Sequence, residues 1–197
     1  MVGTYSAAEV LSSDGGKNSE GPWLYATHPF RLNTVGTALA NPSGVNLSAS
    51  IATYRKQGWF QNNDGWSYGT INTAMLGLAE QAYAMVLERA RAAPAPGYRF
   101  PVFAQHYQDY EPSADHFSVM NTAVHAMLLQ NGEDGANATI VLLPAWPCDV
   151  DVAFKLWGAL NTSVEVVWAN STLVSLVVTP PEREKAVIFA PCNSAEA

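Results

Sequence analysis

The spacing of apolar residues changes once along the chain, and this change most constrains the fold. Between residues 45 and 130 apolar side chains recur every three to four positions, as in Ile71, Met75, Leu78 and Ala82. This is the pattern of helices with one buried face. Further on, the apolar runs TIVLL, DVAFKL, SVEVVW, TLVSLVV and KAVIF are short, β-branched and separated by turn residues, which predicts antiparallel strands. The sequence therefore predicts an α+β chain with helices first and a small β unit last.

The apolar spacing predicts three helices before the strands. The first spans residues 45–59 and the second spans residues 64–92. The third ends at about Gln130, and Ser113 or Asp115 can cap its N-terminus. The second is expected to be the longest and to end at APAPGYRFP, because proline and glycine do not continue a helix. Residues 22–44 are aromatic and rich in turn formers, so we expect a loop there.

This pattern divides the chain into three parts. We expect a flexible lead-in over residues 1–22, a helical domain over 23–147 and a small β-sandwich domain over 148–197. Helices with an apolar face need partners that cover it. The helices expected here call for more helical surface than the chain supplies, so they pack on the β unit or, as we prefer, belong to something larger.

Charge and motif content disfavour several classes of function. The net charge of −7 argues against a nucleic-acid partner, which calls for a Lys/Arg surface. No run approaches the roughly 18 apolar residues of a membrane helix, and the start of the chain lacks the segments of a signal peptide. His106 and His116 form no metal pattern, and no Gly-rich phosphate loop occurs. We therefore expect no nucleic acid, membrane, metal or cofactor.

The cysteines and the glycosylation sequons are the residues that can indicate the cellular compartment of this protein. Cys148 and Cys192 bracket the β region and can either pair or stay free. N-x-S/T sequons begin at four positions: Asn46, Asn137, Asn161 and Asn170. Four sequons favour an extracellular or secretory context, although chance accounts for about two of them in a chain of this composition.

Two runs at the end of the helical part resemble a known family. MLLQ, from Met127, and the later IVLLPAWP resemble the end of the catalytic domain in glycoside hydrolase family 95, the α-L-fucosidases. In that family an (α/α)6 barrel closes with such a helix end and strand, and the general-base aspartate precedes the methionine by twelve positions. Here that position is Asp115. FQNNDGW copies the wording of the family's base motif, but its spacing from Met127 rejects Asp64.

Further segments match the family in the same order. DGWSYGTINTAMLGLAEQAY resembles a G-W-S helix that includes Trp66, and LYATHPFR resembles a loop whose histidine contacts substrate, which corresponds to His28. FKLWGALNTSVEVVWANSTLVSLVV resembles the family's small C-terminal β-sandwich. The resemblance implies a glycan substrate with a terminal α-linked sugar, Asp115 as the catalytic base, and His28, Trp66 and His116 as substrate-binding residues.

The chain departs from the family pattern in ways that matter for function. Asp115 is followed by His-Phe-Ser in place of Gly-Asn-Phe-Gly, and no residue matches the general-acid glutamate, which lies upstream in the family. We therefore expect a fragment of an inverting glycoside hydrolase that lacks the N-terminal part of its barrel and is inactive alone. The alternatives are a non-catalytic carbohydrate-binding or scaffolding remnant, or a complete short protein whose role the sequence does not disclose.

Overall fold

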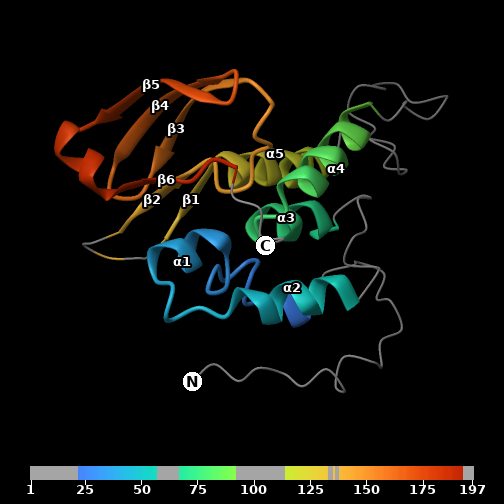
Figure 1. The fold of residues 1–197 in the computed structure, drawn as a ribbon. Helices are drawn as coiled ribbons and strands as arrows, with labels where there is room; N and C mark the ends of the chain where they lie inside the picture. The colour runs from blue at the N-terminus through green and yellow to red at the C-terminus, as the bar shows by residue number, and fades with distance from the viewer. Residues whose placement is uncertain (1–21, 57–66, 92–113, 133–134, 136–137, 193–197) are drawn as a thin grey trace.

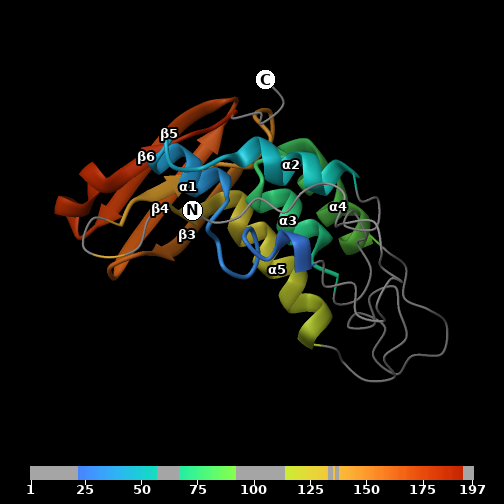
Figure 2. The same cartoon turned by 90° about the horizontal axis from the view of Figure 1, so that it is seen from below.

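The computed structural model describes residues 22–56, 67–91, 114–132, 135 and 138–192, with the backbone alone at residues 22 and 114–117. Helices form one part of the molecule and two small sheets the other (Figure 1). The last helix, α5 (Ala114–Leu128), leads directly into the first strand and runs away from the sheets beside α3 (Gly69–Met75) (Figure 2). The described chain is therefore a mixed α+β structure, as the change in apolar spacing predicts.

The helical part consists of short elements around two apolar cores. These elements are η2 (Pro22–Leu24), α1 (Val35–Ala40), α2 (Leu47–Lys56), α3 (Gly69–Met75) and α4 (Ala79–Arg91). The larger core lies among α3, α4 and α5, and its buried members include Ile71, Met75, Ala82, Val119, Ala123 and Met127. The smaller core lies against α2 and consists of Leu24, Ile51, Tyr54, Leu76 and Leu78. None of the described helices is long and apolar enough to cross a membrane.

The single helix expected over residues 64–92 is wrong, because the chain breaks between α3 and α4. Gly77 lies at the break with φ of +79°, a conformation that side chains disfavour. A Cβ at this position would lie 3.1 Å from Cβ and Cγ2 of Val35, so a side chain here would also crowd α1. The apolar face predicted for this segment is buried on both sides of the break at Ile71, Met75, Leu78, Ala82 and Met85. Val86, its last member, is half-buried.

The loop expected over residues 22–44 contains the short helix α1. A capping box begins it: the side chain of Thr34 accepts from the backbone N–H of Thr37 at 3.1 Å, and Thr37 Oγ1 accepts from the N–H of Thr34 at 2.9 Å. The helix has only six residues, one of which is Gly36. A helix this short does not show a periodic pattern of apolar residues. Local capping and tertiary contact therefore decide this element.

One buried side chain ties together the ends of three helices. Gln130 donates from Nε2 to the carbonyls of Ala126 and Ala74, at 2.9 and 3.1 Å, and accepts from the N–H of Gly36 at 3.0 Å. These groups lie in the last turns of α5 and α3 and the first turn of α1, where helices leave backbone groups unpaired. A Cβ on Gly36 would lie 2.7 Å from Gln130 Cβ, so only glycine permits this approach.

The strands form two three-stranded sheets. One contains β1 (Leu129–Asn131), β2 (Ile140–Leu142) and β6 (Val187–Phe189), in the order β1-β2-β6. The other is an antiparallel meander of β3 (Val152–Gly158), β4 (Thr162–Ala169) and β5 (Thr172–Thr179), and the 3-10 helix η5 (Pro181–Ala186) leads from β5 to β6. Each apolar run predicted as a strand overlaps one of the observed strands.

The expectation of purely antiparallel pairing is wrong at one position. β6 pairs parallel with β2, with Ile140 opposite Val187. The two sheets share an apolar core that includes Ile140, Leu142, Val164, Val166 and Val178. The domain division at 147/148 stays a prediction, although β1 and β2, which precede it, pair in one sheet with β6, which follows it.

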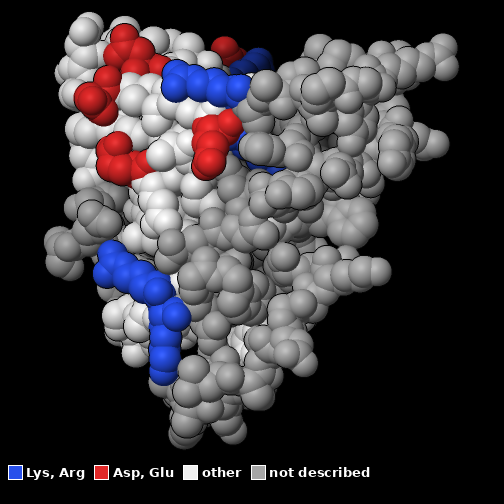
Figure 3. All heavy atoms as spheres, turned by 90° about the vertical axis from the view of Figure 1, so that its right-hand side faces the viewer, with Lys and Arg blue, Asp and Glu red and all other residues white. Residues whose placement is uncertain are grey.

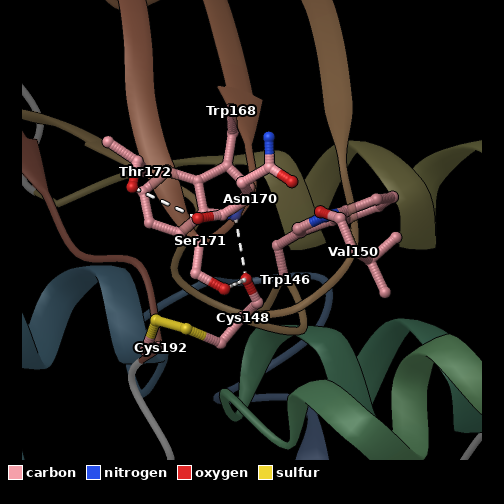
Figure 4. The surroundings of a disulfide bond; sticks show 8 residues. All are labelled: Trp146, Cys148, Val150, Trp168, Asn170, Ser171, Thr172 and Cys192. Carbon is pink, nitrogen blue, oxygen red and sulfur yellow. Dashed lines mark hydrogen bonds between the residues drawn. A yellow bond between two sulfur atoms is a disulfide. The ribbon is translucent and has the colours of Figure 1, made fainter.

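Of the two states left open for the cysteines, the structure shows the paired one. Cys148, which follows β2, and Cys192, which follows β6, form a disulfide across a sequence separation of 44 residues (Figure 4). The bond joins the loop that leads into β3 to the segment after the last strand. It therefore closes a loop that contains the whole β3–β5 meander.

Candidate functional site

The loop between η2 and α1 carries His28, the best-described candidate site residue. Its backbone is held by hydrogen bonds from His28 N to Leu24 O at 2.9 Å and from the N–H groups of Leu32 and Asn33 to Ala26 O at 2.7 and 2.9 Å. The peptide between His28 and Pro29 is cis. The loop thus folds back on itself, and its local hydrogen bonds position the imidazole.

The imidazole of His28 is packed and uncharged near neutral pH. It makes an edge-to-face contact with Tyr68, with ring centroids 4.7 Å apart. Burial, and to a lesser extent the nearby Arg31 guanidinium, lower the pKa of His28 from 6.5 to about 4. Nδ1 is buried and has no hydrogen-bond partner in the described structure. A neutral imidazole has one donor and one acceptor nitrogen, so it can bind a hydroxyl group in either sense.

Further unpartnered polar atoms come from the same two segments. Thr27 Oγ1 and Asn72 Oδ1 are buried and, within the described part of the chain, lack a hydrogen bond. Thr27 precedes His28, and the N–H of Asn72 donates to the carbonyl of Tyr68 one helical turn earlier, at 2.8 Å. Buried polar groups normally have partners, so these unpaired atoms depart from the usual pattern. Sequence reasoning missed both; the run of polar residues inside GTINTAM was the only signal for Asn72.

Tyr68 connects this loop to the helix that carries Asp115. It occupies the N-cap position of α3 and packs against the core that includes Val119 and Ala123 of α5. Asp115 lies in the first turn of α5, one helical turn before Val119. His28 thus contacts Tyr68, and Tyr68 packs against an apolar core to which α5 contributes.

The remaining candidates lie outside what the structure describes. The side chains of Asp115 and His116 are not among the described ones, although their backbone is helical, and Trp66 lies wholly in an undescribed segment. Their roles as catalytic base and substrate contacts stay predictions. Within the described residues no three His, Cys, Asp or Glu side chains gather closely enough to hold a metal ion.

Charge is sparse on much of the described surface. On the face shown in Figure 3, acidic side chains gather in the upper part and basic ones lie in both parts, with uncharged surface between them. His28, Tyr68, Thr27 and Asn72 add hydrogen-bonding capacity without a fixed charge. The Arg31 guanidinium near His28 adds one positive charge beside this set.

No protein-family model, no curated protein and no solved structure matches this chain.

Proposed function

We propose that this chain is part of an inverting glycoside hydrolase that resembles the α-L-fucosidases of family 95. It would supply the end of an (α/α)6 barrel and the β-sandwich that follows. The observation that carries the proposal is the environment of His28. A neutral, half-buried imidazole with an unpartnered nitrogen packs on Tyr68, which adjoins the core of the helix that carries Asp115.

Each candidate residue has a distinct role in this proposal. Inversion needs a carboxylate that activates water on one face of the sugar and a carboxylic acid that protonates the leaving oxygen on the other. Asp115 is the base, and its place in the first turn of α5 suits a carboxylate because the unpaired N–H groups there favour negative charge. His28 binds a sugar hydroxyl, and Trp66 and His116 are further substrate contacts.

The general acid has to come from outside the matched region. No glutamate of this chain corresponds to the acid of the family pattern, so the chain alone is expected to bind sugar without cleaving ordinary glycosides. A glycosyl fluoride relaxes this requirement, because fluoride leaves without strong acid assistance. It therefore reports on Asp115 separately from the missing acid.

The first test measures binding. We would titrate the full chain with L-fucose and with a fucosylated oligosaccharide and follow the complex by NMR. His28→Ala should weaken binding about tenfold, because a buried hydrogen bond to the ligand contributes on the order of 1.4 kcal/mol. The control His125→Ala removes an exposed histidine of α5 and should change nothing. Equal affinity in both variants would contradict the role of His28.

The second test measures turnover in the longest natural protein that contains this chain, with α-L-fucosyl fluoride as substrate. Asp115→Asn should lower kcat by about 10²–10⁴-fold, the usual contribution of a positioned base, without weakening sugar binding. Asp149→Asn, which changes an exposed aspartate, is the matched control. NMR of the first product should show the β-anomer. Unchanged turnover in Asp115→Asn would remove Asp115 as base, and binding without any turnover would favour the carbohydrate-binding remnant.

A further inference from the structure

The turn between β4 (Thr162–Ala169) and β5 (Thr172–Thr179) carries a glycosylation sequon. Asn170 and Ser171 form this turn with φ of 52° and 54°, the left-handed conformation of tight hairpin turns, which asparagine tolerates well. Asn170, Ser171 and Thr172 are all exposed. The complete N-x-T motif therefore lies on the surface of the folded chain.

The backbone of this turn is fixed while the acceptor side chain is left unengaged. The N–H of Asn170 donates to Asp151 Oδ1 at 2.8 Å, and Ser171 Oγ donates to the carbonyl of Cys148 at 3.0 Å. Thr172 Oγ1 donates to the carbonyl of Asn170 at 3.2 Å. Within the described chain the carboxamide of Asn170 makes no hydrogen bond, and Figure 4 shows it directed away from the disulfide. A substituent on its nitrogen would extend into solvent and break no contact.

The disulfide beside this turn is a second, independent observation. Cys148 accepts from Ser171 through its carbonyl and is bonded through its sulfur to Cys192. Structural disulfides form and persist in oxidising compartments such as the endoplasmic reticulum. In eukaryotic cells the same compartment carries out N-glycosylation, so the two features of this corner of the molecule require the same environment.

The structure distinguishes Asn170 from the other sequons. The carboxamide of Asn46 accepts from Ser48 Oγ and from the N–H of Ala49, at 2.7 and 3.3 Å, and so caps α2. Asn161 is exposed, but Thr162 and Ser163 of its sequon are buried in β4. Asn137 lies outside the described residues. Among the described sequons, only that of Asn170 is exposed at all three positions and has an acceptor carboxamide that makes no hydrogen bond.

We infer that Asn170 is an N-glycosylation site of this chain. The donor is a polyprenyl-diphosphate-linked oligosaccharide, and the transferase is a separate enzyme. The nitrogen Nδ2 forms a bond to C1 of the first sugar, the bond from C1 to the diphosphate oxygen breaks, and polyprenyl diphosphate leaves as Nδ2 gives up one proton. No redox change occurs. The inference does not depend on the proposed hydrolase activity.

The test reads occupancy peptide by peptide. The protein is captured from the cells that produce it and treated with peptide-N-glycosidase in heavy-oxygen water, which converts each glycosylated asparagine to a labelled aspartate. In parallel the same cells express Asn170→Gln, Thr172→Val and Thr172→Ser. Thr172→Val keeps the shape of the side chain but removes the sequon hydroxyl, whereas Thr172→Ser keeps the sequon. The protein is captured from whole-cell extracts that include insoluble material, so the occupancy of a variant that folds poorly is still measured.

The expected result is a label at Asn170 in the wild type and in Thr172→Ser, with complete loss in Asn170→Gln and Thr172→Val. Mapping without reductant should show Cys148 and Cys192 in one disulfide-linked peptide pair from the same sample. An unlabelled Asn170 in the wild type overturns the inference, whether or not other sequons carry glycans. Label at Asn170 that persists in Thr172→Val also overturns it, because the modification would then not depend on the sequon.

Discussion

Replacing Gln130 should destabilise the protein far more than its single, uncharged side chain suggests. Its carboxamide holds the N–H of Gly36 and the carbonyls of Ala74 and Ala126, and the side chain is buried, at 7% exposure. Gln130→Met keeps the length and approximate shape of the side chain but forms none of these hydrogen bonds. The perturbation therefore isolates hydrogen bonding from packing.

The magnitude follows from which groups lose their partner. The carbonyl of Ala74 also accepts from the N–H of Gly77 at 3.1 Å and keeps that bond. Gly36 N–H and Ala126 C=O lie at helix ends and have no helical partner. Leaving a buried polar group unpaired costs about 1–3 kcal/mol, so the two together cost about 4 kcal/mol. This is a large fraction of the total stability of a domain, about 5–15 kcal/mol.

Urea unfolding followed by far-UV circular dichroism and tryptophan fluorescence measures the effect. With a slope of about 2 kcal/mol per molar urea, the midpoint should fall by about 2 M. Gln81→Met is the matched control, because Gln81 makes one described hydrogen bond, from Nε2 to Tyr54 OH at 3.1 Å, and Tyr54 OH keeps its contact with Thr73. If Gln130→Met loses no more stability than Gln81→Met, the three-helix role of Gln130 is refuted.

Three other perturbations test the structure by the same unfolding assay. Gly77→Ala should lose about 1–2 kcal/mol through its positive φ and its contact with Val35, and a neutral or stabilising change would contradict the described break. The double variant Cys148→Ser/Cys192→Ser should lose about 2–4 kcal/mol of unfolding free energy, because the disulfide closes a loop with a sequence separation of 44. Its stability should not depend on reductant. If reductant leaves the stability of the wild type unchanged, the disulfide is contradicted. The pKa of His28 is lowered from 6.5 to about 4 in the folded state, so its contribution to stability is complete above pH 6.5 and is lost as the pH falls towards 4. The full pKa shift corresponds to about 3 kcal/mol of stability, which partial exposure reduces to about 1–2 kcal/mol. His28→Gln should therefore lose less stability than the wild type between pH 7 and 4.5. Identical pH profiles of stability in the two proteins would contradict the lowered pKa.

The candidate site shows how far sequence reasoning reaches. The resemblance of LYATHPFR to a loop of the glycoside hydrolase family suggested His28 as a substrate contact. The structure adds three properties of this side chain: contact with Tyr68, burial of Nδ1 and a lowered pKa. The contact with Tyr68 is not local, because Tyr68 approaches from another segment. For Asp115 the sequence supplies only a position, twelve residues before Met127, and its role as base stays a prediction.

The sequence by itself determined the order and type of the main elements. Helical spacing before residue 130 and β-branched runs after residue 138 are properties of neighbouring side chains, and these periods persist whatever the segments contact. Tertiary structure alone decided the parallel pairing of β6 with β2, the use of Gln130 at three helix ends and the meeting of Cys148 with Cys192. Each depends on which distant groups come within bonding distance, and that depends on how the elements pack, which the local spacing of side chains does not encode.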